Sequence, residues 1–343
     1  MTQRKPLNLL IGAAFALAAG AASAQEITLK FHHFLPPNSN AQENLIKPWC
    51  EKIAKESGNR LKCQIYPAMQ LGGTPPQLFD QAKDGVADLI WTVPTYRAGR
   101  FSKSEVFELP FMTLNAEKAS PALWEYIQKH SLDEFKGTKL ILAHVHDGAV
   151  FHFGSKGPRN LEEMKGLKVR APTRIGSRVI SAMGMIPVQM PAPAVPESIS
   201  KGVVDGAMIP WEVVTPLKLQ EITKFHVEVP VGMPKPSNTI FVIAMNQAKY
   251  DGLPADLKKV IDQNSGLEAS KWAGKVFDGP EAGARKISED RKNTFIRITP
   301  EEYKRWVTAT DNVDDDWMKE VGAKGANGKA LVDDAKALLK KYD

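Results

Sequence analysis

The chain has 343 residues, of which 43% are hydrophobic and 24% charged, so it is long enough for two domains with their own cores. This composition excludes a disordered chain, and two cysteines are too few for a disulfide-rich framework. Forty-five Lys and Arg against 39 Asp and Glu give a net charge of +6, which taken alone suggests an anionic partner such as a nucleic acid.

The first 24 residues predict a secretory signal peptide. Arg4 and Lys5 form a basic start, residues 9–19 are apolar, and Ala22-Ser23-Ala24 is a small-residue cleavage site. An uncleaved anchor is the alternative, but the apolar stretch is short for a bilayer. Cleavage leaves 319 residues and removes two basic and no acidic residues, so the net charge falls from +6 to +4. We therefore expect an exported protein and no nucleic-acid partner.

The mature chain begins with alternating strand and helix patterns. Three β-rich runs are separated by two helical ones, and this βαβαβ rhythm predicts a parallel sheet covered by helices. A long helical segment begins at residue 253 and is interrupted near 279–280. The predicted strands are residues 26–34, 61–66, 88–93, 139–146, 168–170 and 239–245, and the shorter predicted helices are 41–57, 77–83 and 176–183.

The two cysteines lie on neighbouring predicted elements. Cys50 belongs to the helix 41–57 and Cys63 to the strand that follows it. A helix that folds back on its next strand would bring the two thiols together, and export would permit a disulfide. Two buried free thiols are the alternative.

A short sequence pattern occurs twice. Gly85-Val86-Ala87-Asp88 returns as Gly202-Val203-Val204-Asp205, each time after a helix and before a strand. Glycine ends a helix by accepting a positive φ, and aspartate stabilises the turn into the strand. Two copies predict two similar α/β lobes, with chance similarity as the alternative. Because ligands of open α/β sheets bind beyond the carboxyl ends of strands, residues 91–96 and 209–212 are expected to face a cleft between the lobes.

His144 and His146 suggest a different chemistry. Two histidines separated by one residue on a strand share a face, which is a spacing that zinc can use. Third and fourth ligands at suitable positions are missing, and the sequence contains no phosphate-binding loop or nucleophile motif. We therefore expect no metal, no other cofactor and no enzymatic activity. An exported zinc-dependent hydrolase using His144 and His146 is kept as an alternative.

Several spaced blocks carry a family resemblance across nearly the whole mature chain. In this order, they resemble the substrate-binding proteins of tripartite ATP-independent periplasmic (TRAP) transporters. No block is decisive alone, but together they are specific. The blocks are residues 29–37, 70–73, 84–89, 108–111, 164–172 and 202–206.

The resemblance implies a two-lobed, periplasmic-binding-protein-like α/β fold with hinge strands and a long helix spanning both lobes. It places residues 25–148 and 236–270 in the first lobe and 149–235 and 271–343 in the second. It also implies a monomeric receptor in the periplasm that closes on an organic acid and delivers it to a TRAP membrane permease driven by an ion gradient. A receptor for an ATP-driven importer is the closest alternative.

The family's carboxylate-binding arginine corresponds to Arg170, in the run Gly166-Leu167-Lys168-Val169-Arg170. A guanidinium offers paired, permanently charged donors that match the two oxygens of a carboxylate. Many members follow the second glycine–aspartate pattern with an asparagine that helps to hold this group, whereas here residues 207–212 contain none. Several dicarboxylate and sugar-acid binders also carry a second arginine, where this chain has residues 150–153, Val-Phe-His-Phe. These departures predict a small monocarboxylate with an apolar or aromatic body, 2-hydroxy and 2-keto acids included.

Further residues are candidates for contact with the body of the ligand. Trp211 and Phe34 could stack on it or pack within their lobes, and Glu212 could accept from a ligand hydroxyl or help to bind a cation. Arg174 could reinforce the positive field or be solvated at a helix start. The complete predicted set is Arg170, Trp211, Phe34, Tyr96, His33, Trp91, His152, Glu212, Arg174 and Asn238.

Overall fold

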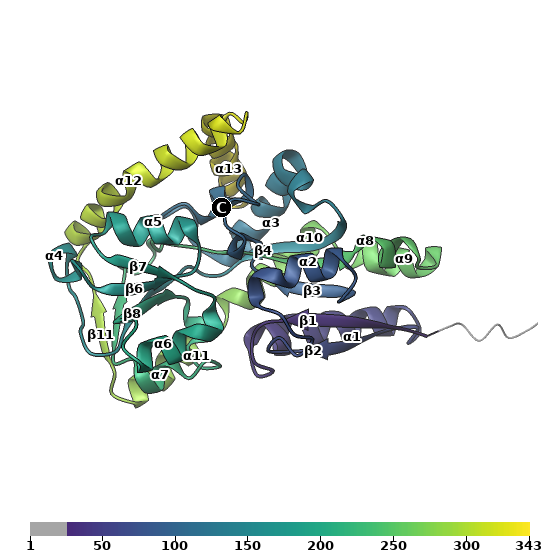
Figure 1. The fold of residues 1–343 in the computed structure, drawn as a ribbon, viewed down its shortest axis with the longest axis horizontal. Coiled ribbons are helices and arrows are strands. Elements are labelled where there is room, and N and C mark those ends of the chain that lie inside the picture. Colours follow the sequence, from purple (N-terminus) through teal and green to yellow (C-terminus); the bar gives the residue numbers. More distant parts are fainter. Residues whose placement is uncertain (1–25) are drawn as a thin grey trace, which may run out of the picture.

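The computed structural model describes residues 26–343, which form two α/β lobes, each built around one sheet (Figure 1). The predicted signal peptide, residues 1–24, lies outside the described residues. Among residues 26–343, no helix is long and apolar enough to cross a membrane.

The first sheet has the strand order β2-β1-β3-β10-β4. Its first three strands are parallel, as the βαβαβ rhythm predicted, and β10 runs antiparallel to both of its neighbours. Apolar side chains such as Leu29 and Phe31 are fully buried beneath the covering helices. The strands are β1 (Ile27–His33), β2 (Leu61–Tyr66), β3 (Leu89–Thr92), β4 (Thr138–Val145) and β10 (Ile240–Asn246).

The second sheet has the strand order β11-β9-β5-β8-β6-β7. Strand β6 is parallel to β7 and β8, and β5 is antiparallel to β8 and β9. These strands are β5 (Val150–Phe153), β6 (Lys168–Ala171), β7 (Ile186–Gln189), β8 (Gly206–Ile209), β9 (Phe225–Glu228) and β11 (Thr294–Arg297).

Helices cover both sheets (Figure 1). The predicted helix 41–57 is a π-helical segment, η1 (Ala41–Ile46), continued by α1 (Lys47–Glu56). The other α-helices are α2 (Leu78–Lys83), α3 (Ala116–Tyr126), α4 (Leu161–Met164), α5 (Arg174–Ala182), α6 (Val195–Ser200), α7 (Leu219–Ile222), α8 (Gln247–Asp251), α9 (Ala255–Gln263), α10 (Leu267–Asp278), α11 (Glu281–Asp290), α12 (Pro300–Ala323) and α13 (Gly328–Tyr342).

Two chain segments cross between the sheets and lie side by side. Residues 146–149 connect β4 to β5 and residues 229–239 connect β9 to β10, and the Ala149 N–H donates to the Ser237 carbonyl over 2.8 Å. The long helix α12 runs along the upper edge in Figure 1, from α4 and α5 toward α13. Its Trp317 indole donates to the Ser102 carbonyl of the first lobe over 3.0 Å. The two-lobed α/β fold with crossing strands and a long helix is thus confirmed.

Two helices do not follow the predicted division of the chain. The boundary at residue 270 cuts through α10, which packs as one unit against α3 and β4. Helix α13 also packs against α3, where Lys341 Nζ and the Tyr342 hydroxyl donate to Glu125. Both contacts join segments far apart in the sequence. We therefore propose that α10 and α13 belong to the first lobe instead of the second.

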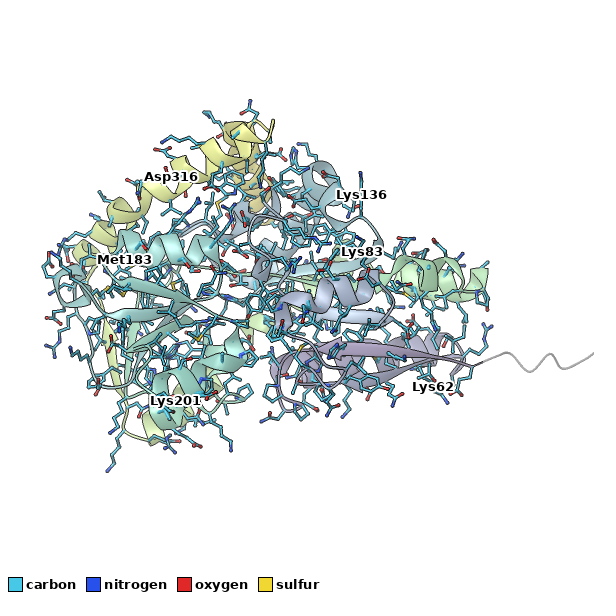
Figure 2. All side chains as sticks on the ribbon, viewed as in Figure 1. Lys62, Lys83, Lys136, Met183, Lys201 and Asp316 are labelled. Carbon is cyan, nitrogen blue, oxygen red and sulfur yellow. A yellow bond between two sulfur atoms is a disulfide. The ribbon has the colours of Figure 1, made fainter. Side chains whose placement is uncertain are left out.

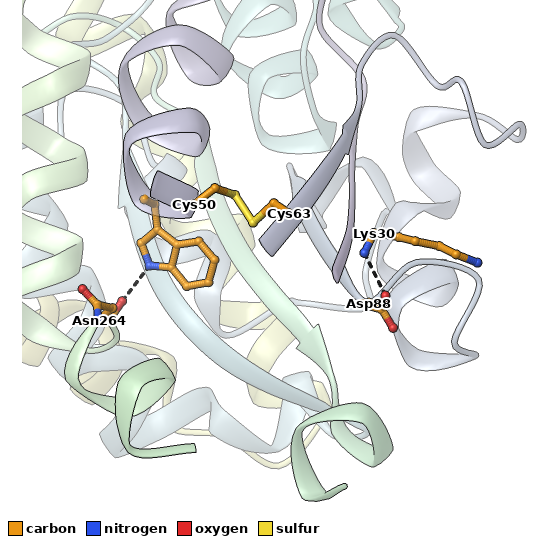
Figure 3. Close-up of a disulfide and its surroundings, with 6 residues drawn as sticks. Lys30, Cys50, Cys63, Asp88 and Asn264 are labelled. Atoms are coloured by element: carbon orange, nitrogen blue, oxygen red, sulfur yellow. Dashed lines mark hydrogen bonds between the residues drawn. A yellow bond between two sulfur atoms is a disulfide. The ribbon is translucent and has the colours of Figure 1, made fainter. Parts of the chain in front are cut away.

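A disulfide joins Cys50 on α1 to Cys63 on β2, with 5.7 Å between the two Cα atoms (Figure 3). We expect replacement of both cysteines by serine to lower the free energy of unfolding by about 3 kcal/mol, because a crosslink over a loop of this size restricts the unfolded chain. Denaturant unfolding of the variant and the parent measures the difference. Equal midpoints and slopes would contradict the expectation.

The charged side chains are distributed over many elements and both lobes (Figure 2). Lys62 lies on β2 of the first lobe, whereas Lys201 and Asp316 lie on the second lobe and on α12 (Figure 2). Some ion pairs, such as Lys201–Glu197, join two exposed side chains.

Candidate ligand-binding site

A cavity with about 330 Å³ of empty space, open solvent included, lies between the two lobes. It forms where strands of both sheets end and where the crossing segments pass. Its lining is mostly apolar, with a few polar groups. The lining residues are Phe34, Leu35, Trp91, Val93, Tyr96, His146, Arg170, Pro172, Ala192, Ile209, Pro210, Glu212, Val213, Thr239 and Phe241.

The repeated glycine–aspartate pattern builds the same turn in each lobe. Gly85 and Gly202 both have positive φ, at 79° and 69°. The Asp88 carboxylate accepts from the Lys30 N–H on the neighbouring parallel strand, and Asp205 accepts from the Lys168 N–H in the same way, each over 2.8 Å. The strands that follow, β3 and β8, lead residues 91–96 and 209–212 to the cavity, as predicted.

Arg170 is held inside the cavity wall without an acidic partner. It lies on β6 and is only 2% exposed, and its Nε and Nη1 donate to the Met190 and Met208 carbonyls over 2.9 and 3.0 Å. No carboxylate of residues 26–343 forms an ion pair with it. Burial lowers the pKa of Arg170, while the neighbouring Tyr96 hydroxyl opposes this shift. The guanidinium nevertheless stays charged, because its ordinary pKa is so high. A fixed, desolvated cation of this kind is suited to bind a carboxylate.

Stacked aromatic rings form one wall of the cavity. Trp91 stacks on both Phe34 and Phe241, with ring centroids 5.0 and 4.8 Å apart and interplanar angles of 18° and 8°. The Tyr96 ring meets Phe34 edge-on at 5.6 Å, and its hydroxyl accepts from the Ala192 N–H over 3.2 Å. Flat, rigid rings at this wall favour a planar apolar ligand body.

His146 and Glu212 are buried polar groups of the same cavity. His146 Nδ1 accepts from the Gly148 N–H over 2.9 Å, and burial is the main cause that places the pKa of His146 well below its usual range. His146 is therefore neutral and carries its proton on Nε2. Burial also raises the pKa of Glu212 to about 8, so this carboxyl group is mostly protonated at pH 7.

The predicted ligand contacts therefore fall into two groups. Arg170, Phe34, Tyr96, Trp91 and Glu212 all line the cavity. The side chains of the other five predicted residues are buried elsewhere or form ion pairs. Those five are Trp211, His33, His152, Arg174 and Asn238.

Trp211 packs within the second lobe and does not face the cavity. Its indole N–H donates to Glu228 Oε1 over 3.0 Å, and its ring stacks on Phe295 at 5.7 Å. Its neighbours Pro210 and Glu212 do line the cavity. Successive residues of the short 3₁₀ turn η8 (Trp211–Val213) point in different directions, and the contacts of Trp211 agree with the alternative that it packs within its lobe.

His33 and His152, the two predicted histidines, each form hydrogen bonds with the protein, although His33 Nδ1 has no partner among residues 26–343. His33 Nε2 donates to Gln42 Oε1 over 2.9 Å. His152 Nε2 donates to the Ile209 carbonyl over 3.2 Å, which leaves its Nδ1 to accept from His226 Nδ1 over 2.7 Å. Both side chains are fully buried in their lobes, and neither lines the cavity.

The side chains of Arg174 and Asn238 bond to other parts of the protein and do not line the cavity. Arg174 begins α5 in the second lobe and pairs with the buried Glu105 of the first lobe and with Glu320 of α12. Asn238 donates to the Thr113 hydroxyl and to the His146 carbonyl, over 2.5 and 3.0 Å. Asn238 thus fixes the backbone at His146 without reaching the cavity.

The histidine pair suggested for zinc has no free nitrogen at His144. Trp91 Nε1 donates to His144 Nε2 over 2.9 Å, and His144 Nδ1 lies 3.0 Å from the Val145 carbonyl, to which it donates. Across residues 26–343, no three His, Cys, Asp or Glu side chains are grouped so that they could hold a metal ion. Both ring nitrogens of His144 are therefore already engaged by Trp91 and Val145.

Comparison with known proteins decides the family. The family model described as bacterial extracellular solute-binding protein, family 7 (DctP), matches residues 31–320. The chain belongs to this family. The resemblance to TRAP substrate-binding proteins is thereby confirmed, because the similar solved structures carry that description.

Three solved structures are similar to this solute-binding protein over nearly its whole length. A TRAP solute binding protein from Rhodoferax ferrireducens T118, in complex with copurified benzoate, is 46% identical with a TM-score of 0.91, covering 92% of this chain and 98% of that one. A marine metagenome TRAP solute binding protein specific for aromatic acid ligands, with 3-hydroxybenzoate, is 41% identical with a TM-score of 0.91, covering 93% and 99%. A TRAP periplasmic solute binding protein from Bordetella bronchiseptica, with (R)- and (S)-mandelate, is 26% identical with a TM-score of 0.85, covering 92% and 100%.

The set of predicted ligand contacts leaves out three polar or aromatic residues of the cavity in this solute-binding protein: His146, Thr239 and Phe241. The position of His146 at the carboxyl end of β4 could have indicated it by the rule used for β3 and β8. Thr239 and Phe241 stand at the amino end of β10, which runs antiparallel to its neighbours. The rule for parallel strands does not apply there, so only the sheet topology reveals them.

Proposed function

We propose that this solute-binding protein is a periplasmic receptor for a small monocarboxylate with an aromatic body, and that Arg170 pairs with the carboxylate. The observation that carries this proposal is the buried guanidinium without an acidic partner, set in a cavity walled by aromatic rings. A ligand that brings one negative charge and a flat apolar body complements both features.

The cavity offers no second cation for a dicarboxylate. Arg170 is the only Lys or Arg among the lining residues, and His146 is neutral. A second carboxylate would be desolvated beside apolar groups, at a cost that the site does not offset. Benzoate, 3-hydroxybenzoate and mandelate in the related structures are monocarboxylates with an aromatic ring, which supports the same class of ligand here.

The proposed role includes delivery of the bound acid to a membrane transporter. The relatives are described as TRAP solute binding proteins, which favours a TRAP membrane permease as the partner over an ATP-driven importer. We further propose that the receptor acts as a monomer, without a cofactor and without enzymatic turnover. Its lobes would close around the acid, so that contacts from both lobes form together.

A thermal-shift screen tests the proposed ligand class. Ligand at about one hundred times its Kd stabilises the folded state by roughly 2.7 kcal/mol, so the melting temperature is expected to rise by several degrees with benzoate, hydroxybenzoates and mandelate. Benzamide, which has the same ring without a charge, is the matched control and is expected to give no shift. Shifts with succinate or sugar acids alone would overturn the proposal.

A further inference from the structure

Glu212 brings a carboxyl group into the cavity without a partner from the protein. The residue is 4% exposed, and its Oε2 is fully buried with no hydrogen-bond partner among residues 26–343. It forms no ion pair within this part of the chain, although Arg170 lines the same cavity. A buried polar atom left unpaired costs roughly 1–3 kcal/mol, so a ligand group that satisfies Glu212 would recover this free energy.

Glu212 and Arg170 line the same cavity from neighbouring elements of the second lobe. Arg170 lies on β6 and pairs in register with Ala207 of the neighbouring parallel strand β8. Glu212 lies in η8, five residues beyond Ala207 and past the carboxyl end of β8. An acid whose carboxylate is held at Arg170 can therefore present a second polar group to Glu212.

The protonation state of Glu212 restricts the chemistry of that second group. Since burial raises the pKa of Glu212 to about 8, the protonated carboxyl offers one O–H donor and one carbonyl acceptor at pH 7. A hydroxyl group donates and accepts in the same way and carries no charge. The neutral His146 adds no charge to the same cavity, so the guanidinium of Arg170 is left to balance the single ligand carboxylate.

We propose that Glu212 binds a hydroxyl group on the body of the ligand, so that the receptor selects hydroxy-substituted aromatic monocarboxylates over their unsubstituted parents. This inference rests on the proposed function, because it presupposes that Arg170 holds the carboxylate. It makes Glu212 a specificity-determining residue of the same site.

Calorimetric titration of benzoate and of 2-, 3- and 4-hydroxybenzoate tests the inference. For the parent protein, we expect at least one hydroxybenzoate to bind tenfold or more tightly than benzoate. In Glu212→Leu this ratio is expected to fall to about one, and in Glu212→Gln to be partly retained, because an amide also donates and accepts. Glu197→Gln, at an exposed glutamate of the same lobe, is the matched control and is expected to keep the parent ratio.

The outcomes separate this inference from the function on which it rests. Equal affinities for benzoate and all three hydroxybenzoates, or an undiminished preference in folded Glu212→Leu, would overturn the role of Glu212 while leaving the binding of aromatic acids in place. Failure of all four acids to bind the parent protein would overturn the proposed function, and the role of Glu212 with it. Thermal unfolding of each variant verifies that it is folded before titration.

Discussion

Replacing Arg170 by alanine is expected to weaken the binding of an aromatic acid by about a hundredfold or more while the protein remains folded. Two charge-assisted hydrogen bonds to a carboxylate contribute roughly 1.5–3 kcal/mol each, and every 1.4 kcal/mol corresponds to about a tenfold change in affinity. The guanidinium makes no ion pair within residues 26–343 and is anchored by two backbone carbonyls. Its loss therefore breaks no ion pair within the protein, although the Met190 and Met208 carbonyls lose a donor.

Calorimetry with benzoate measures the affinity, and circular dichroism with thermal unfolding verifies the fold. Arg170→Lys is expected to recover only part of the binding, because one ammonium group cannot reproduce the paired donors of the guanidinium. Arg159→Ala, at an exposed arginine of the same lobe, is the matched control. Unchanged affinity in folded Arg170→Ala would refute the proposed carboxylate pair.

The second large effect is expected at Glu108, which joins the two lobes. Glu108 lies in η4 (Ser104–Glu108) and is fully buried. It accepts from the Thr95 hydroxyl of the first lobe over 2.6 Å and from the Thr173 hydroxyl of the second lobe over 2.7 Å. It also accepts from the Ile240 N–H over 3.3 Å, so one carboxyl group links both lobes and the start of β10.

Glu108→Ala is expected to lower the free energy of unfolding by about 3 kcal/mol or more, because three donors lose their acceptor and each unpaired buried group costs roughly 1–3 kcal/mol. We also expect weaker ligand binding, by about tenfold or more, since the arrangement of the two lobes around the cavity loses a contact between them. Small-angle scattering with saturating benzoate is expected to show a larger radius of gyration than for the parent.

Two further variants serve as comparisons for Glu108→Ala. Glu108→Gln keeps the size of the side chain and is expected to have a smaller effect on both quantities, because one oxygen still accepts. Glu43→Ala, at an exposed glutamate of the first lobe, is expected to match the parent in stability and affinity. A Glu108→Ala variant with the stability, affinity and compactness of the parent would show that Glu108 does not hold the lobes together.

The sequence determined the local elements of this protein and part of its site. Strong hydrophobic patterns placed β1, β2 and β3, and the repeated glycine–aspartate turns indicated that two strands end at one cavity. Arg170 could be identified because its block is one of several that together resemble the TRAP substrate-binding proteins. These features depend on residues that are neighbours along the chain, so they can be predicted from the sequence.

The tertiary structure decided what depends on contacts between distant segments. Only the packing of the second lobe turns Trp211 away from the cavity while the adjacent Glu212 faces it. Likewise, the bonds from Arg174 to Glu105 and Glu320 could form only after the lobes and α12 had come together. The type of a residue and its position on a helix or strand are local properties. The direction of its side chain and the groups that this side chain contacts follow from the packing of the whole chain.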